Sequence, residues 1–243
     1  MIIGASTGLG RHIAATLAQQ CWNVCGIGRR AGRSADLGFD YVRADLADWT
    51  DIARLKARLA AEPPDLVVFN AAVYAAAASG QEAPEELEAL FRVNAIAPYA
   101  LLYEYVAGAS ASLRTCVIVN SDAIFHANLQ SGVYAASKAA LRVLTATLAH
   151  AAKSSNAAAA TLLLGPLADD RKRAEFSRIA ERRGIAEAQV VKTFLERSNP
   201  AFVIDALLPY DACTESVKHI VALGRAANGM VCKLDGGSSG SLF

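Results

Sequence analysis

The chain has 243 residues, a formal net charge of +1 and 53% hydrophobic residues. This composition excludes a disordered chain, and the near-neutral charge gives no global attraction to nucleic acid or to an anionic membrane. The five scattered cysteines favour free thiols, mostly buried, in a reducing compartment. Cys21 and Cys25 lack a second Cys/His pair at ligand spacing, so we predict no metal site. With no secretory signal pattern and no apolar run of spanning length, we expect a cytoplasmic protein without membrane or nucleic-acid partners.

The first segments predict a strand, a glycine-rich turn and a helix. Residues 1–3 are apolar, residues 4–10 read GASTGLG, and residues 11–18 have helical apolar spacing. Glycines let the backbone approach phosphate oxygens, and the helix N-terminus that follows offers amide donors and a positive dipole end. We therefore predict a phosphate-binding turn formed by Gly4, Ser6, Thr7, Gly8, Leu9 and Gly10.

The end of the second predicted strand, residues 23–28, bears on cofactor choice. A carboxylate at this point would bind a ribose 2′-hydroxyl and repel a 2′-phosphate. The chain has Arg29 and Arg30 there instead, with Arg33 close behind. Guanidinium groups suit phosphate, so we predict NADP(H) in preference to NAD(H), although a solvated basic turn is the alternative.

Alternating strands and helices continue through the middle of the chain. Residues 39–43 and 65–69 read as strands, with a helix over residues 49–61 between them. The apolar run at 65–69 is typical of a central parallel strand, and the small residues after it, Asn70, Ala71 and Ala72, leave room for a ligand. A helix over residues 84–107 carries Asn94 at mid-length, where asparagine is mildly unfavourable.

The segment from Ser121 to Lys138 suggests acid–base chemistry. Residues 115–120 predict a buried strand with Ser121 at its exit, and residues 131–152 predict a helix. On that helix Tyr134 and Lys138 are four residues apart and share a face. A nearby ammonium would stabilise phenolate and bring the tyrosine pKa nearer neutrality. A tyrosine–lysine pair of this spacing is, by itself, more often a surface pair.

The last third of the chain adds a strand at residues 157–164, a turn at Gly165 to Leu167, a helix at residues 211–223 and a strand at residues 230–234. The charged segment around residues 168–208 interrupts this rhythm, and we interpret it as a substrate lid rather than a second domain. The strand–helix alternation predicts one α/β domain over residues 1–243, a Rossmann-type doubly wound parallel sheet in three αβα layers.

The chain resembles the short-chain dehydrogenase/reductase family, in its compact single-domain branch, over nearly its whole length. The residues that match the family's motifs are the glycine turn 4–10, Asp45, the Phe69–Ala72 segment, the tetrad Asn94, Ser121, Tyr134 and Lys138, the Leu164–Leu167 turn, and Asp235–Gly237. The departures are Ile3 for threonine, Phe69 for asparagine, Ala72 for glycine and Leu164 for proline. They lie around the cofactor and remove no reacting group. The Tyr–Lys spacing differs from that of the enoyl-reductase relatives, and the length and glycine spacing differ from those of the epimerase branch.

The resemblance implies hydride transfer between a nicotinamide and a carbonyl or carbinol carbon. Tyr134 would exchange the proton, Lys138 would hold the ribose, Ser121 would polarise the carbonyl, and Asn94 would position a relay water. It further implies cofactor contacts from Asp45, at the adenine, and from Leu46, Asn70, Ala71, Ala72, Tyr134, Lys138, Gly165 and Leu167. By likeness we also expect a homodimer or a homotetramer, the latter pairing the helices that carry Asn94 and Tyr134.

The substrate is less well specified. The residues that we expect near it are Val73, Tyr74, Phe125, His126, Asn128 and Leu129, with the lid residues Phe176, Ile179, Phe194, Phe202 and Val203. An apolar lining would favour a partly hydrophobic ketone or alcohol, whereas the basic run at residues 171–173 would favour an anionic substrate or carrier. The alternatives to an enzyme are an NADP(H)-binding regulator without catalysis and an interaction module with a decayed site.

Overall fold

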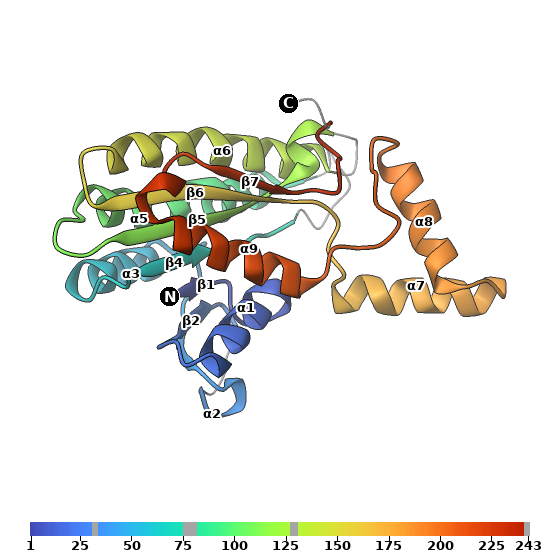
Figure 1. Ribbon diagram of the computed structural model, residues 1–243, viewed down its shortest axis with the longest axis horizontal. Helices are drawn as coiled ribbons and strands as arrows, with labels where there is room; N and C mark the ends of the chain where they lie inside the picture. The colour runs from blue at the N-terminus through green and yellow to red at the C-terminus, as the bar shows by residue number, and fades with distance from the viewer. Residues whose placement is uncertain (31–33, 75–81, 127–130, 241–243) are drawn as a thin grey trace.

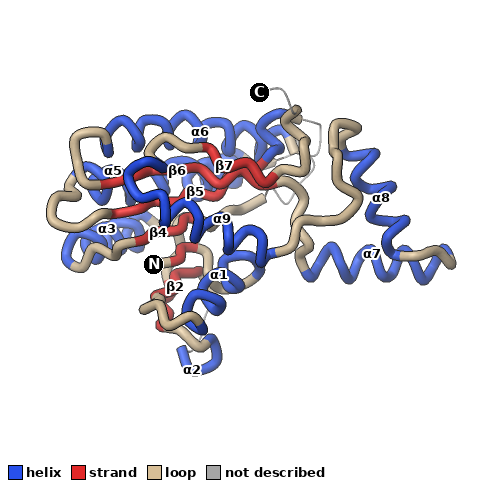
Figure 2. The backbone as a smooth tube through the Cα atoms, viewed as in Figure 1, coloured by secondary structure: helices blue, strands red, loops and turns tan. Residues whose placement is uncertain are grey.

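The computed structural model describes residues 1–30, 34–74, 82–126 and 131–240 of the chain. Its centre is a seven-stranded sheet, with all strands parallel and in the order β3-β2-β1-β4-β5-β6-β7. Helices flank the sheet (Figures 1 and 2). The strands are β1 (Ile2–Ile3), β2 (Cys25–Gly28), β3 (Asp40–Arg43), β4 (Leu66–Phe69), β5 (Arg114–Ser121), β6 (Ala157–Leu164) and β7 (Val231–Leu234).

The helices form a layer on each face of the sheet. On one side α1 (Gly8–Gln19) packs against α9 (Tyr210–Leu223), and on the other α5 (Ala97–Ala107) packs between α3 (Trp49–Ala61) and α6 (Gly132–Ala152). The remaining helical segments are α2 (Ser34–Leu37), α4 (Pro84–Phe91), the π-helix η1 (Arg92–Ile96), the 3-10 helices η2 (Asp122–Phe125) and η3 (Gly224–Ala227), α7 (Asp170–Arg183) and α8 (Glu187–Ser198).

Each layer has its own hydrophobic core, and successive strand residues contribute to opposite cores. In β4, Val67 and Phe69 pack toward α3 and α5, whereas Leu66 and Val68 pack toward α1 and α9. This alternation follows from the two-residue period of a β-strand. All four residues are buried, as the continuous apolar run predicted. The three-layer doubly wound fold is therefore confirmed.

The strand register places the ends of four strands at one edge. Ile3 pairs with Phe69, Phe69 pairs with Ile118, and Ser121 pairs with Leu164. The strand order reverses between β1 and β4, and ligands of open α/β sheets bind at the carboxyl ends of the strands beside such a reversal. The fold thus directs the glycine turn and the residues after β4, β5 and β6 toward one crevice.

The helix predicted over residues 84–107 is interrupted, which corrects that prediction. A π-helical turn, η1, separates α4 from α5. Pro98 has no N–H to donate to the carbonyl of Asn94, so the regular hydrogen bond is missing at that point. The asparagine side chain turns inward from the widened segment and is fully buried. Widened turns of this kind are frequent at functional sites.

The segment between β6 and α9 leaves the sheet and returns beside its own start. Ala168 N donates to Leu208 O at 2.9 Å, and Leu208 N donates to Pro166 O at 2.9 Å. Between these two points α7 and α8 project from the carboxyl edge of the sheet (Figure 1). They enclose a small core of their own around Phe176, Ala180 and Val190. A lid function for this helix pair stays a prediction.

Two compositional expectations have structural outcomes. Only Cys116 and Cys213 are buried, whereas Cys25 and Cys232 are half-buried and Cys21 is exposed, so the expectation of mostly buried thiols is wrong.

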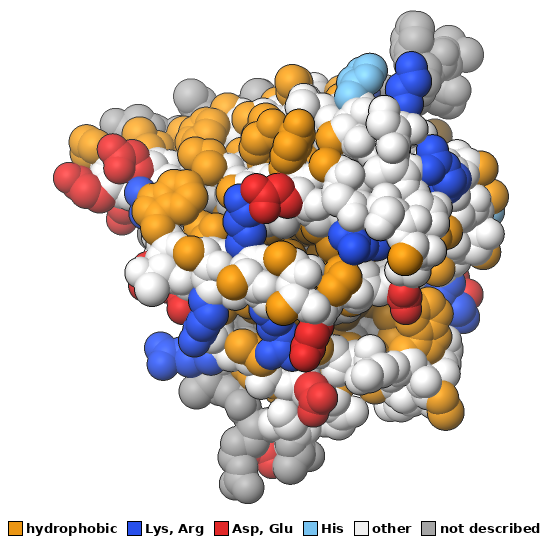
Figure 3. Space-filling view, turned by 90° about the vertical axis from the view of Figure 1, so that its left-hand side faces the viewer, with side chains coloured by type: hydrophobic (Ala, Val, Ile, Leu, Met, Phe, Trp, Pro, Cys, Tyr) orange, Lys and Arg blue, Asp and Glu red, His pale blue; other side chains and the backbone are white. Residues whose placement is uncertain are grey.

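Within the described part of the chain, no helix combines the length and the apolar character needed to cross a bilayer. On the face opposite α7 and α8, acidic, basic and hydrophobic side chains are interspersed (Figure 3).

Candidate active site

Two adjoining cavities lie along the carboxyl edge of the sheet. One, of about 400 Å³, is lined by the glycine turn and the end of β2, and the other, of about 430 Å³, is lined by the ends of β5 and β6 and by α6. Residues that line both cavities join them into one crevice: Asn70, Ala72, Tyr74, Leu167 and Asp169. We refer to them as the nucleotide cavity and the substrate cavity, by the groups that we expect in each.

The glycine turn has the geometry of a phosphate cradle. Gly4 has a φ of +94°, and a Cβ there would lie 2.6 Å from Ala71 N. Helix α1 begins at Gly8, has no acidic residue in its first turn and receives no side-chain cap from Thr7. Its first amide groups therefore keep their capacity to bind an anion. Of the predicted turn residues, Gly4, Ser6, Thr7, Gly8 and Leu9 line the nucleotide cavity.

Gly10 has a different role from the other glycines. It lines neither cavity, and a Cβ on it would lie 2.1 Å from Gly4 O and 2.6 Å from Asn70 Nδ2. The absence of a side chain lets α1 approach the end of β1 and leaves room for Asn70 to donate to Gly4 O at 3.3 Å. Gly10 thus shapes the turn by packing.

The far end of the nucleotide cavity is basic on one side. Arg29 and Arg30 line it, and their carbonyls accept hydrogen bonds from Arg43 Nε and Tyr41 Oη, which fix the backbone there. Among the described residues, neither guanidinium forms an ion pair within 4.0 Å. Arg33 lies outside the described residues.

Asp45 and Leu46 form the opposite wall of the nucleotide cavity, together with Ala71 and Ala72. Asp45 Oδ1 accepts from Ala47 N at 3.0 Å, and its own N–H donates to Asp51 Oδ2 at 2.7 Å. These hydrogen bonds hold the turn after β3 in one conformation, because both of its ends are fixed. A wall of this kind suits a flat ring.

Asn94 connects the strand ends to helix α6. Its Oδ1 accepts from Val73 N at 2.8 Å, and its Nδ2 donates to Val73 O at 2.9 Å and to Ser137 Oγ at 3.0 Å. The carboxamide therefore clamps the segment after β4. The relay water expected from Asn94 stays a prediction, because the described contacts of this side chain are all to protein groups.

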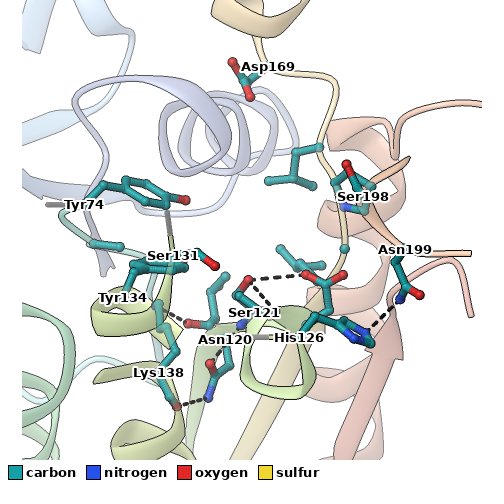
Figure 4. A pocket seen from close by; sticks show the side chains of 18 of the residues that line it. Tyr74, Asn120, Ser121, His126, Ser131, Tyr134, Lys138, Asp169, Ser198 and Asn199 are labelled. Carbon is teal, nitrogen blue, oxygen red and sulfur yellow. Dashed lines mark hydrogen bonds between the residues drawn. The ribbon is translucent and has the colours of Figure 1, made fainter. Parts of the chain in front are cut away.

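Ser121, Tyr134 and Lys138 meet in the substrate cavity (Figure 4). Ser121 is the last residue of β5, and Tyr134 and Lys138 lie one turn apart on α6. The Lys138 ammonium is buried, donates to Val119 O at 3.1 Å, and lies 6.0 Å from the centre of the Tyr134 ring. Since an ammonium has three donors, Lys138 can bind further oxygens from the cavity. The structure thus brings these three side chains together, and their catalytic roles stay a prediction.

The expected pKa of Tyr134 is wrong in this arrangement. Burial raises the pKa of the Tyr134 phenol well above its ordinary value, and the neighbouring Tyr74 raises it further. The Tyr74 ring stacks on Tyr134 with centroids 4.3 Å apart (Figure 4). Burial also lowers the pKa of Lys138, to about 8. Desolvation is the largest cause of both pKa shifts, and the Lys138 ammonium donates to Val119 O. Tyr134 is therefore protonated at neutral pH.

Two residues that the sequence analysis missed position this wall. Asn120 donates from Nδ2 to Lys138 O at 3.1 Å and accepts from Ser121 N at 2.8 Å, which ties β5 to α6. Asp122 lines the substrate cavity, and its Oδ1 accepts from Ser121 Oγ at 3.4 Å. Its place directly after Ser121 was a signal available in the sequence.

The predicted substrate-contacting residues separate into two groups. Tyr74, His126, Phe194 and Phe202 line the substrate cavity. The others do not: Val73 lines the nucleotide cavity, Phe125 is exposed beside Arg142, Phe176 and Ile179 pack in the core of α7 and α8, and Val203 is 80% exposed. Of the basic run at residues 171–173, only Lys172 lines the substrate cavity. Asn128 and Leu129 lie outside the described residues.

The carboxyl end of β6 closes the substrate cavity. Gly165 and Leu167 line it, and a Cβ on Gly165 would lie 2.7 Å from Asp235 O. The Asp235 carboxylate accepts from Gly237 N at 3.1 Å and from Ser239 N at 3.2 Å. Burial disfavours this charge, but these hydrogen bonds, with that from the Ser239 hydroxyl, lower the pKa of Asp235 overall. The C-terminal motif therefore braces the turn after β6.

No group of three or more His, Cys, Asp or Glu side chains suited to a metal ion occurs in the part of the chain that the structure describes. The crevice instead offers what a dinucleotide needs. It has backbone donors at the start of α1, a bare backbone at Gly4, a buried ammonium with donors to spare, and guanidinium groups at one end. The residues present thus fit a nicotinamide dinucleotide.

Comparison with known proteins agrees with this geometry. Among solved structures, a short chain dehydrogenase/reductase family protein matches with a TM-score of 0.74 at 23% identity, covering 98% of this chain and 95% of that one. A 4-hydroxyisoleucine dehydrogenase complexed with NADH matches with a TM-score of 0.82 at 19% identity, covering 98% and 97%. L-Sorbose reductase from Gluconobacter frateurii, complexed with NADPH and L-sorbose, matches with a TM-score of 0.79 at 16% identity, covering 99% and 96%.

These likenesses, all below 25% identity, show the fold. A search of curated protein sequences found no significant match. The family profile described as short chain dehydrogenase matches residues 1–178, which is more than half of the chain. The chain therefore belongs to the short-chain dehydrogenase/reductase family of oxidoreductases.

Proposed function

We propose that the protein is an NADP(H)-dependent oxidoreductase that interconverts a ketone and a secondary alcohol. The observation that carries this proposal is the convergence of Ser121, Tyr134 and Lys138 in a cavity that adjoins a phosphate-binding turn. The bound nicotinamide would supply or accept the hydride at the reacting carbon. The side chains of this chain handle the oxygen and its proton.

In the reductive direction Tyr134 is the acid. Its raised pKa keeps the phenol protonated, so a proton is available for the alkoxide oxygen. Ser121 donates a hydrogen bond to the same oxygen, and the nearby charge of Lys138 stabilises the phenolate that forms. Fixed donors aimed at developing negative charge usually supply the largest catalytic effect. Asn94 keeps the strand ends in place through its hydrogen bonds to Val73.

The preference for NADP(H) rests on Arg29 and Arg30. They line the nucleotide cavity directly after β2, where no carboxylate is present to repel a 2′-phosphate. The solved relatives are described with NADH in one case and with NADPH in another, so the cofactor preference depends on these two residues.

We also propose a homo-oligomer. Three exposed apolar side chains support this assembly: Ile96 on η1, Tyr103 on α5 and Val143 on α6, the last of which is 68% exposed. Burial of such residues between copies of the chain would remove apolar surface from water. Sedimentation velocity of the wild type and of a Val143→Glu variant tests this proposal. The variant should sediment as a smaller species than the wild type.

The function is tested with Tyr134→Phe. We expect kcat for ketone reduction to fall by roughly 100-fold or more, the usual contribution of general acid catalysis, while NADPH still binds. Tyr99→Phe is the matched control, because Tyr99 is a half-buried tyrosine on α5 that lines neither cavity. Turnover retained by Tyr134→Phe would refute the mechanism. Stabilisation by NADPH without turnover of any carbonyl by the wild type would favour a non-catalytic regulator.

A further inference from the structure

The substrate cavity contains a carboxylate that the proposed chemistry does not use. Asp122 is the first residue of η2, directly follows Ser121, and has Oδ1 3.4 Å from Ser121 Oγ. Ser121 is expected to bind the reacting oxygen, so the carboxylate lies one hydrogen bond away from it. A group on the carbon next to the reacting carbonyl would face Asp122.

Asp122 differs from Asp169, another carboxylate of the cavity, because it has no Lys or Arg partner among the described residues. Asp169 lies 3.8 Å from Lys172 Nζ and also caps α7 by accepting from Lys172 N at 2.9 Å. Lys138 donates to Val119 O. Among the described residues, no Lys or Arg lies within 4.0 Å of the Asp122 carboxylate. Asp122 is half-buried, so its carboxylate has lost part of its hydration, and a ligand donor would bind it favourably.

Burial raises the pKa of Asp122, and the Ser238 hydroxyl, the proximity of His126 and the hydrogen bond from Ser121 offset this only in part. The surroundings of Asp122 are fixed from three parts of the chain. His126, from the end of η2, lies 2.6 Å from Ser238 O through Nε2, and Asn199 donates to the same carbonyl at 2.9 Å. Figure 4 shows His126 and Asn199 turned toward each other at the side of the cavity. This frame holds η2 in place, so the carboxylate stays directed into the cavity.

We propose that Asp122 is a specificity-determining residue that selects ketones with a hydrogen-bond donor, a hydroxyl or an ammonium, on the carbon next to the carbonyl. This inference rests on the proposed ketone–alcohol function. Two effects act together. The donor satisfies the half-buried carboxylate, and it releases the Ser121 hydroxyl from Asp122, so that this hydroxyl can donate to the reacting oxygen instead.

The geometry limits the donor to the adjacent carbon. Adjacent carbons carry their polar atoms within a hydrogen-bond length of each other, which matches the short separation of the Asp122 and Ser121 oxygens. A simple ketone has no such donor and would leave the carboxylate to compete for the Ser121 proton. The cavity of about 430 Å³ is at the small end of ligand sites, which suits a compact polar substrate.

Three ketones of equal size test the proposal: hydroxyacetone, aminoacetone and butanone, which differ only in the terminal group. NADPH oxidation gives kcat/KM for each with the wild type, Asp122→Asn, Asp122→Ala and Glu175→Gln. The last variant is the control, because Glu175 is an exposed carboxylate on α7 that lines neither cavity. Asp122→Asn preserves the shape of the side chain, so we expect this variant to fold like the wild type.

We expect the wild type to prefer a donor-bearing ketone over butanone by roughly 10- to 100-fold, the range for a hydrogen bond to a charged group. The preference should disappear in Asp122→Ala and persist in Glu175→Gln. If the donor is a hydroxyl, Asp122→Asn keeps part of the preference, because the amide oxygen still accepts. If the donor is an ammonium, Asp122→Asn loses the preference, because the negative charge of the carboxylate is gone.

Two results would overturn the inference alone. One is a wild type that reduces butanone as efficiently as hydroxyacetone and aminoacetone, and the other is an Asp122→Ala variant that keeps the wild-type preference. Failure of the wild type to oxidise NADPH with these ketones and with a broad carbonyl panel would refute the ketone–alcohol function itself, and the role of Asp122 with it.

Discussion

Replacing Gly10 with alanine should push β1 and α1 apart. We expect lower thermal stability and weaker NADPH binding, although no side chain proposed to take part in the reaction is changed. The new methyl carbon would lie 2.1 Å from Gly4 O and 2.6 Å from Asn70 Nδ2. The first of these neighbours is backbone, and it lies in a turn whose amides Gly4 N and Ala5 N both donate to Ile27 O. The clash can therefore be relieved only by moving the turn or the helix.

The size of the effect follows from these contacts. Inserting a methyl into a packed site costs about 1–3 kcal/mol. Loss of the Asn70–Gly4 hydrogen bond adds about 1 kcal/mol, and the better helix propensity of alanine returns about 1 kcal/mol. A net loss of about 1–3 kcal/mol lowers Tm by roughly 2–12 °C for a domain of this size. The displaced turn should also weaken NADPH binding.

The assay is thermal unfolding followed by circular dichroism, with NADPH titration by fluorescence. Gly132→Ala is the matched control, because a Cβ at this position of α6 would have no neighbour within 4 Å among the described residues. Its Tm should equal or exceed that of the wild type, since alanine favours helix by up to about 1 kcal/mol. A Gly10→Ala variant as stable as the control would refute the close-approach argument.

Replacing both Arg29 and Arg30 with alanine should lower kcat/KM for NADPH by about 10-fold or more, which is the scale of hydrogen bonds to charged groups. The kcat/KM for NADH should change little. Equal losses with both cofactors would contradict a role of the two arginines at the 2′-phosphate. Asn94→Ala should lower the free energy of unfolding, measured by urea denaturation, by roughly 2–4 kcal/mol, because the backbone N–H and C=O of Val73 both lose their hydrogen-bond partner. A loss below about 1 kcal/mol would show that the hydrogen bonds between Asn94 and Val73 are dispensable for stability. Because the pKa of Lys138 is lowered to about 8 by burial, the unfolded chain binds this proton more tightly, and the stability contribution of the group rises as the pH increases from 8 toward 10.5. Relative to Lys138→Met, the wild type should gain on the order of 3 kcal/mol over that range in urea titrations, and a constant difference would contradict the burial of the charge.

Much of the site was predictable because its signals are local. The glycine turn is followed by helical spacing, Ser121 ends an apolar strand, and the interval between Tyr134 and Lys138 puts both on one helix face. Each of these patterns depends on backbone periodicity over fewer than ten residues. The strand–helix alternation is equally local, so the fold class followed from it.

Other features depend on which distant segments meet. The adjacency of β1 and β4, which forms the crevice, arises from pairing between segments more than 60 residues apart. The π-turn at Asn94 and its hydrogen bonds to Val73 require the segment after β4 to pass beside it. The apolar residues of α7 were predicted to face substrate, yet they pack against α8, because a helix face buries itself against whichever neighbour the chain supplies.

The sequence by itself determined the elements, their order, and the identity of the residues at the strand ends, because periodicity and turn chemistry are properties of neighbouring residues. Only the tertiary structure decided the ionisation of the site: burial raises the pKa of Tyr134 and lowers the pKa of Lys138, and Asp122 has no Lys or Arg partner within the described part of the chain. The physical reason is that desolvation depends on everything packed around a group, and that surrounding is assembled from the whole chain.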